Sequence, residues 1–179
     1  MEIEIKATFE DKQKVKAELK KLGAKEEKQK HQIDEYYNHP QRDTRKTKEY
    51  IRLRYKPNEN TGVFAYHVNI ADGVTKEYET AVDNLEVFKQ ILNGLNFPLL
   101  GVIDKKRETF KLGEFSITLD EVKDIGNFIE IETDGEESQI AEKKEALAQM
   151  LEKMGISRDK IRNDVWLCDI ATGKVNFVK

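Results

Sequence analysis

Apolar and polar residues alternate with a period of two along much of this chain. In Met1–Phe9 every odd position is apolar and every even position is charged or threonine, which predicts a β-strand with one apolar and one polar face. Similar alternation predicts further strands, some with a clear pattern and some with a weaker one: Tyr50–Lys56, Phe115–Asp120, Phe128–Asp134, and more weakly Ile33–Asn38, Val63–Ile70, Lys76–Val82 and Ile103–Phe110. Glycine turns between them favour short connections, so we expect about eight strands in a mostly antiparallel sheet.

Other stretches follow the helical period. Asp11 is placed to cap a first helix, which ends at Gly23, and Asp83 or Asn84 is placed to cap a second helix. A third helix begins at Ser138 and ends at Gly155. Their inward residues include Val15, Leu19 and Leu22 in the first, Phe88, Ile91, Leu92 and Leu95 in the second, and Leu147, Leu151 and Met154 in the third. A fourth helix is predicted from Ser157 to about Asp169. The fold class is therefore α+β, with helices packed outside the sheet.

Composition narrows the function classes. The 179 residues fit one domain spanning the whole chain, residues 1–179. Lys and Arg number 31 against 34 Asp and Glu, and this balance argues against a nucleic-acid partner, which would favour a basic excess. No apolar run approaches the ~20 residues of a membrane helix, and the start MEIEIK does not resemble a secretory signal. With Cys168 as its sole cysteine, the chain has no intrachain disulfide, and we expect it to be cytoplasmic.

The charged faces of several strands carry one sign only. Arg52, Arg54 and Lys56 share one face, and Glu130, Glu132 and Asp134 share another. A solvated face explains any single strand, yet like charges roughly 7 Å apart on a strand repel one another and favour opposite partners across the sheet. If the strands close into a barrel under external helices, the charged face becomes its interior. Such an interior must be wet, ion-paired or filled by a charged ligand.

The side chains expected inside this barrel suit a particular ligand. Its acids are Glu2, Glu4, Asp120, Glu130 and Glu132, and its bases are Lys6, Arg52, Arg54, Lys105 and Arg107. Carboxylates hold hard divalent cations such as Mg²⁺ or Mn²⁺ through oxygen, and the bases can neutralise phosphate oxygens. An interior with both chemistries fits a triphosphate, which is itself anionic and metal-chelating.

At these residues the sequence resembles the CYTH superfamily, the triphosphate tunnel metalloenzymes that include class IV adenylyl cyclases and thiamine triphosphatases. Glu2-Ile3-Glu4-Ile5-Lys6 matches the family's ExExK signature, and further blocks follow in the family's order: Asp34-Glu35-Tyr36-Tyr37, Ile51-Arg52-Leu53-Arg54, Ile103-Asp104-Lys105-Lys106-Arg107, Thr118-Leu119-Asp120 and Gly126–Glu132. The resemblance implies a closed or nearly closed eight-stranded antiparallel β-barrel that accepts a triphosphate with a divalent metal. It implies phosphate-binding roles for the five bases and metal-binding roles for the five acids named above.

The chain departs from the family pattern at two places. His67 stands where the family commonly has a lysine, and we assign it to the phosphate-binding set, with a hydrogen-bonded strand histidine as the equal alternative. The family's frequent Ser-Tyr pair is not evident in Asn163-Asp164-Val165-Trp166. Glu77 and Glu79 would either pair with arginines of the interior or lie on a solvated face.

The residues assigned closest to the chemistry are Glu2, Glu4 and Lys6, where Glu2 or Glu4 would orient a metal ion or accept a proton. Chain length and block spacing resemble the class IV cyclase branch of the family, and this resemblance implies a cyclase that converts ATP to cyclic AMP and pyrophosphate. An inorganic or thiamine triphosphatase that releases phosphate is the alternative, and a binding module without turnover is the second alternative. By analogy with the family, a homodimer is an assembly that the chain could form.

Overall fold

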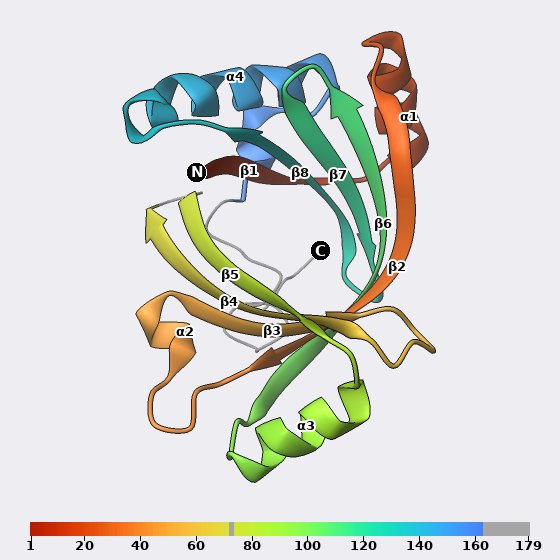
Figure 1. The fold of residues 1–179 in the computed structure, drawn as a ribbon. Helices are drawn as coiled ribbons and strands as arrows, with labels where there is room; N and C mark the ends of the chain where they lie inside the picture. Colours follow the sequence, from red (N-terminus) through yellow and green to blue (C-terminus); the bar gives the residue numbers. More distant parts are fainter. Residues whose placement is uncertain (72–73, 163–179) are drawn as a thin grey trace.

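A computed structural model describes residues 1–71 and 74–162 of the chain. Eight strands form a closed, wholly antiparallel barrel in the order β1-β5-β4-β3-β2-β6-β7-β8 (Figure 1). The strands are β1 (Glu2–Phe9), β2 (Lys25–Tyr37), β3 (Glu49–Tyr55), β4 (Gly62–Ala71), β5 (Val74–Val82), β6 (Leu99–Leu112), β7 (Phe115–Val122) and β8 (Gly126–Asp134). The ring closes where β1 meets β5, with Glu2 opposite Thr75 and Ile3 opposite Val74. The predicted α+β barrel is confirmed.

The helices lie on the outside of the barrel. They are α1 (Lys12–Lys21), α2 (Thr44–Thr47), α3 (Leu85–Gly94) and α4 (Ile140–Lys153), with short 3-10 turns at Glu137–Gln139 and Arg158–Lys160. The Asp11 side chain accepts a hydrogen bond from the Lys14 backbone N–H at 3.0 Å and so caps α1. Asn84, rather than Asp83, caps α3 by accepting from the Val87 N–H at 3.1 Å. Among the described helices, none is long and apolar enough to span a bilayer.

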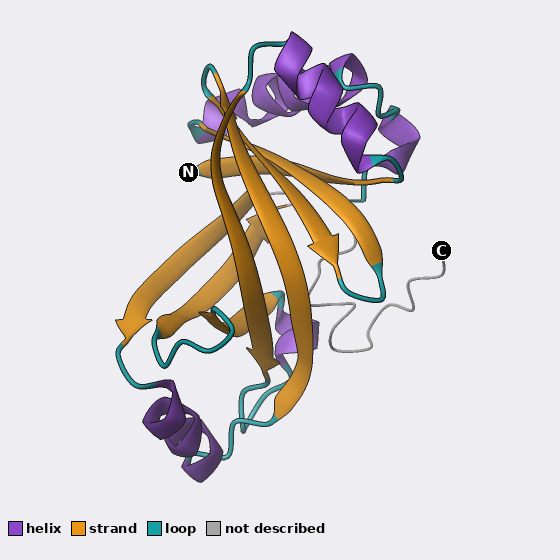
Figure 2. Cartoon of the chain, turned by 90° about the vertical axis from the view of Figure 1, so that its right-hand side faces the viewer, coloured by secondary structure: helices purple, strands orange, loops and turns teal. Residues whose placement is uncertain are grey.

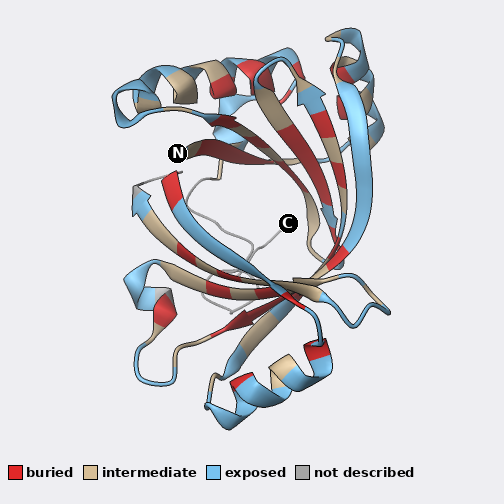
Figure 3. Cartoon of the chain, in the orientation of Figure 1, coloured by how far each residue is buried: buried red, intermediate tan, exposed pale blue. Residues whose placement is uncertain are grey.

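Four local expectations differ from the structure. On α3, Ile91 and Leu95 were expected to face inward but are 49% and 59% exposed, because only one side of this helix packs on the barrel. Strand β2 begins at Lys25, eight residues before the predicted start at Ile33, because its exposed first half pairs with β6 up to Lys111; Figure 3 shows this half in pale blue. Helix α2 was not predicted. The predicted helix from Ser157 is wrong in its described part, where a 3-10 turn is followed by a bridge from Ile161 to Ala7. Its remainder, with Val165, Trp166, Leu167 and Cys168, lies outside the described residues, as does the Asn163–Trp166 segment.

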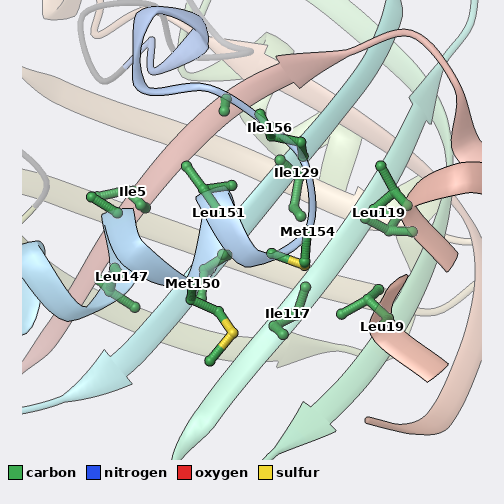
Figure 4. Packing of buried hydrophobic residues seen from close by; sticks show 14 of the residues in the cluster. Ile5, Leu19, Ile117, Leu119, Ile129, Leu147, Met150, Leu151, Met154 and Ile156 are labelled. Atoms are coloured by element: carbon green, nitrogen blue, oxygen red, sulfur yellow. The ribbon is translucent and has the colours of Figure 1, made fainter. Parts of the chain in front are cut away.

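Two apolar clusters hold the helices against the barrel. The larger one joins α1 and α4 to β1, β6, β7 and β8, and its centre includes Leu151, Met154, Ile5, Ile117 and Ile129 (Figure 4). The smaller one lies under α3, at the other end of the molecule in Figure 2, and its members include Leu53, Leu85 and Leu92. These residues occupy the apolar face of each strand, so the opposite, charged face points into the barrel.

The interior of the barrel is not charged throughout. Tyr36, Ile103, Val122 and Phe128 form a small apolar cluster, and by their position along the strands they share the inward face with Lys105, Asp120 and Glu130. Tyr36 and Tyr50 also line the charged cavity described below. Tyr36 itself is buried, with 8% of its surface exposed.

Candidate functional site: a charged tunnel

A cavity of about 240 Å³ inside the barrel brings together most of the predicted site residues. Strand register explains the convergence, because inward side chains of neighbouring strands lie opposite or diagonal to one another: Lys6 is opposite Glu130, and Arg107 is opposite Asp120. The predicted residues that line the cavity are Glu2, Glu4, Lys6, Arg52, Arg54, His67, Lys105, Arg107, Glu130 and Glu132. Glu77 and Glu79 of β5 line it as well.

Asp120, predicted as a metal ligand, is held by two cations. Its carboxylate accepts hydrogen bonds from Arg107 at 2.7 and 2.6 Å and from Lys105 Nζ at 3.0 Å. On the other side of Lys105, Asp34 of β2 lies 3.4 Å from the same Nζ and accepts two hydrogen bonds from Arg54, at 2.6 and 2.8 Å. Two arginines and a lysine are thus fixed by two buried aspartates, and the metal-binding role of Asp120 stays a prediction.

These contacts shift the pKa values of the buried groups. Burial alone would raise the pKa of Asp34, but Lys105 and Arg54 hold it far below its usual range. Burial would likewise raise the pKa of Asp120, and here Arg107 and Lys105 reverse the effect. The pKa of Lys105 is lowered to about 8, first by burial and then by the positive charge of Arg107.

Asp34 is a buried residue beside the cavity's cations to which sequence reasoning assigned no role. The sequence feature that could have indicated Asp34 is its position two residues before Tyr36, which places both side chains on the inward face of β2. Apolar and polar residues alternate only weakly in this strand. The exposed surface of Asp34 is 0% of the total. Because it binds Arg54 directly, we interpret it as the residue that positions this guanidinium toward the cavity.

Lys6 of β1 lies between two carboxylates. Its Nζ is 3.1 Å from Glu130 and 3.6 Å from Glu4. Burial would lower the pKa of Lys6, but Glu130 and Glu4 raise it above its usual value. In Glu130 burial is outweighed by Lys6 and Arg107, which together lower the pKa of the carboxyl. Lys6 and Glu130 are therefore both charged at neutral pH.

Three glutamates at the β1–β8 side of the cavity form a different environment. Glu2, Glu4 and Glu132 each offer one carboxylate oxygen, and these oxygens lie within 4.8 Å of one another. Burial and the charge of Glu132 raise the pKa of Glu2 to about 8. Burial raises the pKa of Glu4 in spite of Lys6, and burial followed by the charge of Glu130 raises that of Glu132. Mutually repelling oxygens at this spacing fit a hard divalent cation, which would remove the repulsion.

His67 and two glutamates form a second group on β4 and β5. His67 Nδ1 lies 3.1 Å from Glu77, and Nε2 lies 3.7 Å from Glu79. Glu79 also accepts a hydrogen bond from Arg52 Nη2 at 2.9 Å. Glu79 thus pairs with an arginine of the interior, as one of the two expectations held, whereas Glu77 pairs with His67, and both glutamates remain exposed.

The fold and this tunnel lead to the family, and comparison with known proteins agrees. The CYTH domain model matches residues 1–163, so the chain belongs to the CYTH family, as the motifs indicated. A protein of Methanocaldococcus jannaschii named "Putative adenylate cyclase MJ0240" is 36% identical over 168 residues, which cover 90% of this chain and 93% of that protein.

Solved structures share the fold. The PH1819 protein of Pyrococcus horikoshii superposes with a TM-score of 0.81 at 27% identity, covering 93% of this chain and 96% of that one. The HpAC1 protein of Hippeastrum, whose structure is described as that of a "putative adenylyl cyclase" with a dominant triphosphatase activity, superposes with a TM-score of 0.64 at 19% identity, covering 87% of this chain and 89% of that one.

Proposed function

We propose that the chain is a divalent-metal-dependent enzyme that acts on a triphosphate inside its tunnel. The proposal depends above all on one observation, the convergence of five cationic side chains and a three-glutamate group on a single cavity: Lys6, Arg52, Arg54, Lys105 and Arg107 with Glu2, Glu4 and Glu132. Lysine and arginine neutralise phosphate oxygens, and arginine can bind them through two hydrogen bonds. A triphosphate with its metal suits both halves of this arrangement.

Mg²⁺ or Mn²⁺ is the cofactor that we propose, held by Glu2, Glu4 and Glu132. The raised pKa values of these three carboxyls support the assignment, because burial first and the neighbouring carboxylates after it disfavour their charged forms, which a divalent cation would stabilise. Such an ion supplies charge neutralisation and orientation of phosphate oxygens when it is bound. Glu130 extends the set, and in the present structure its carboxylate faces Lys6 and lies 3.9 Å from Arg107.

The protein's own contribution is positioning and electrostatic stabilisation. Phosphoryl transfer needs little covalent help from a protein, and fixed cations stabilise the charge that spreads over the phosphate oxygens. Arg54 and Arg107 would hold those oxygens, and Asp34 and Asp120 keep both guanidinium groups oriented. Glu2 or Glu4 would orient the metal ion or accept a proton.

Adenylyl cyclisation is the reaction that we place first. A ribose hydroxyl of ATP would attack the α-phosphorus, the bond from that phosphorus to the bridging oxygen would break, and pyrophosphate would leave while the hydroxyl proton passes to a base. The name of the M. jannaschii relative supports this order. The description of the Hippeastrum protein supports the alternative, in which water attacks a triphosphate and phosphate is released. A binding module without turnover is the third candidate, favoured by His67 in place of a lysine.

A product assay separates these candidates. Purified protein is incubated with ATP, inorganic triphosphate or thiamine triphosphate, each with Mg²⁺ or Mn²⁺. Cyclic AMP with pyrophosphate identifies a cyclase, phosphate release identifies a triphosphatase, and tight binding without product identifies a module. Absence of binding to all three compounds would refute the proposal.

A matched pair of variants ties the result to the tunnel. Arg107 points into the cavity, whereas its neighbour Lys106 is exposed on the outer face of the same strand. Arg107→Gln should abolish triphosphate binding or turnover, and Lys106→Gln should leave both unchanged. Equal effects of the two substitutions would place the activity elsewhere on the protein.

A further inference from the structure

The imidazole of His67 is held in an unusual way inside the tunnel. The residue is 7% exposed and lines the cavity from β4. Strand pairing sets Glu77 directly opposite it, and Nδ1 lies 3.1 Å from a Glu77 oxygen. The other ring nitrogen, Nε2, is buried and has no hydrogen-bond partner among the described residues. It lies 3.7 Å from a Glu79 oxygen, too far for a hydrogen bond.

This arrangement matches the usual setting of a metal-binding histidine. Such a histidine donates one ring N–H to a carboxylate, which fixes the tautomer and directs the lone pair of the other nitrogen at the ion. With Nδ1–H donating to Glu77, the lone pair of the buried Nε2 has no hydrogen-bond partner among the described residues and lies beside Glu79. His67, Glu77 and Glu79 each offer a ligand atom, and these atoms lie within 4.8 Å of one another.

A phosphate is a poor match for the same nitrogen. A phosphate oxygen at Nε2 would lie next to the Glu79 carboxylate, and two negative charges at that separation repel each other strongly in a partly buried cavity. A cation between Nε2 and Glu79 is attracted by both. Arg52 donates to the same Glu79 oxygen at 2.9 Å, so Glu79 must either present its second oxygen to the ion or release Arg52.

We propose that His67 and Glu79 bind a first-row transition-metal ion, with Glu77 as the positioning residue for the imidazole. The site is distinct in chemistry from the three-glutamate group, which offers oxygen alone. Imidazole nitrogen suits ions such as Fe²⁺, Ni²⁺ or Zn²⁺ better than Mg²⁺, which takes oxygen ligands, and Mn²⁺, which oxygen also suits, is the paramagnetic probe for the site. The tunnel then holds two cation sites of different preference, and the histidine that replaces the family's lysine is a metal ligand.

Pulsed electron paramagnetic resonance on the Mn²⁺-loaded protein, without any triphosphate, tests the proposal. An imidazole ligand produces a modulation from its nitrogen nucleus that carboxylate ligands do not. We expect this modulation in the wild type at two equivalents of Mn²⁺ and its loss in His67→Gln. The matched control is His31→Gln, because His31 is an exposed histidine that contacts Asp104 outside the tunnel. His31→Gln should keep the signal.

Two further variants guard against a folding artefact. His67→Lys places a cation between Glu77 and Glu79, so the barrel should fold, and the nitrogen modulation should still be lost. Glu77→Gln should keep the signal and weaken Co²⁺ binding, measured by calorimetry, by about 10- to 100-fold. Mg²⁺ should not displace the nitrogen-bound Mn²⁺ at equal concentration.

Three results would overturn the proposal: no nitrogen modulation in the wild type, modulation that persists in His67→Gln, or displacement by Mg²⁺ at equal concentration. Each would leave His67 as an ion-pair partner or a phosphate contact. Since the measurement uses neither substrate nor turnover, its failure would not touch the proposed triphosphate chemistry. Conversely, a chain that turns over no triphosphate could still show the nitrogen signal.

Discussion

Asp34 is the buried charge whose removal should disturb the tunnel most clearly. Its carboxylate is fully buried, accepts two hydrogen bonds from Arg54 at 2.6 and 2.8 Å, and lies 3.4 Å from Lys105 Nζ. The substitution Asp34→Asn preserves the volume of the side chain and removes its charge. The amide can still accept one hydrogen bond, but its N–H groups face the second Arg54 donor and Lys105.

The burial and the partners of Asp34 set the size of the expected loss in the free energy of unfolding. Removing one partner of a buried ion pair costs about 3–5 kcal/mol, because the other charge stays buried and uncompensated. The lower end applies here, since the Arg54 side chain is 20% exposed and Lys105 keeps Asp120 as a partner. A loss of about 3 kcal/mol corresponds to a fall in Tm of roughly 6–12 °C for a chain of this length.

Urea unfolding followed by circular dichroism, in a chelating buffer, measures this loss. Asp104→Asn is the matched control, because Asp104 of β6 also contacts an oppositely charged type of side chain, His31, at 2.6 Å. In this pair the side chains of His31 and Asp104 are both about one-third or more exposed. An exposed pair contributes about 0–1 kcal/mol. If Asp34→Asn lost no more stability than Asp104→Asn, the interpretation of Asp34 as the anchor of Arg54 would be wrong.

Further substitutions and conditions test the proposed ligands. Arg54→Ala should weaken triphosphate binding more than tenfold in calorimetry, as a charge-assisted hydrogen bond contributes about 1.5–3 kcal/mol, and unchanged affinity would exclude Arg54 from the site. Glu130→Gln should raise the metal concentration needed for activity, and an unaltered metal titration would reject its role as a ligand. Mg²⁺ affinity should rise between pH 6 and pH 8 with release of protons, because the pKa of Glu2 is about 8 and those of Glu4 and Glu132 are also raised. Calorimetry in buffers of different ionisation enthalpy measures the protons released, and pH-independent affinity would contradict the assignment.

The strands and their two faces could be predicted because side-chain alternation is a local property of the extended backbone. In Met1–Phe9 the pattern alone assigned Ile3 and Ile5 to the apolar side and Glu2 and Glu4 to the interior, and the structure agrees. The first half of β2 gave no such signal, since Lys25–His31 is exposed throughout. Ile161 fits helical spacing, yet its backbone pairs with Ala7, more than 150 residues earlier, and no local pattern records such a contact.

The convergence of the site was predictable, but the pairing inside it was not. Sign and face of each charge follow from the sequence, whereas the partner of each charge depends on register across the barrel. Asp120 and Glu130 were assigned alike from the sequence, yet the structure directs Asp120 at Arg107 and Lys105 and sets Glu130 beside Lys6. Asp34 went without a role for the same reason, because its partner Arg54 is on another strand.

The charge distribution of the tunnel gives a physical reason for the metal dependence that we propose. Among the described residues, eight carboxylates point inward or lie buried against the inward cations, and five lysine and arginine side chains oppose them: Glu2, Glu4, Asp34, Glu77, Glu79, Asp120, Glu130 and Glu132 against Lys6, Arg52, Arg54, Lys105 and Arg107. Above the raised pKa values of Glu2, Glu4 and Glu132, a triphosphate that entered this interior without metal would meet an excess of negative charge, although four of the cations lie on strands β3 and β6. Divalent ions bound by Glu2, Glu4 and Glu132 would make the net charge positive on the side of the tunnel formed by β1, β5 and β8. On that side burial, followed by the charges of Glu132 and Glu77, raises the pKa of Glu2. Under the proposed function, we therefore expect the metal to bind before or together with the polyanion, whichever phosphorus is attacked.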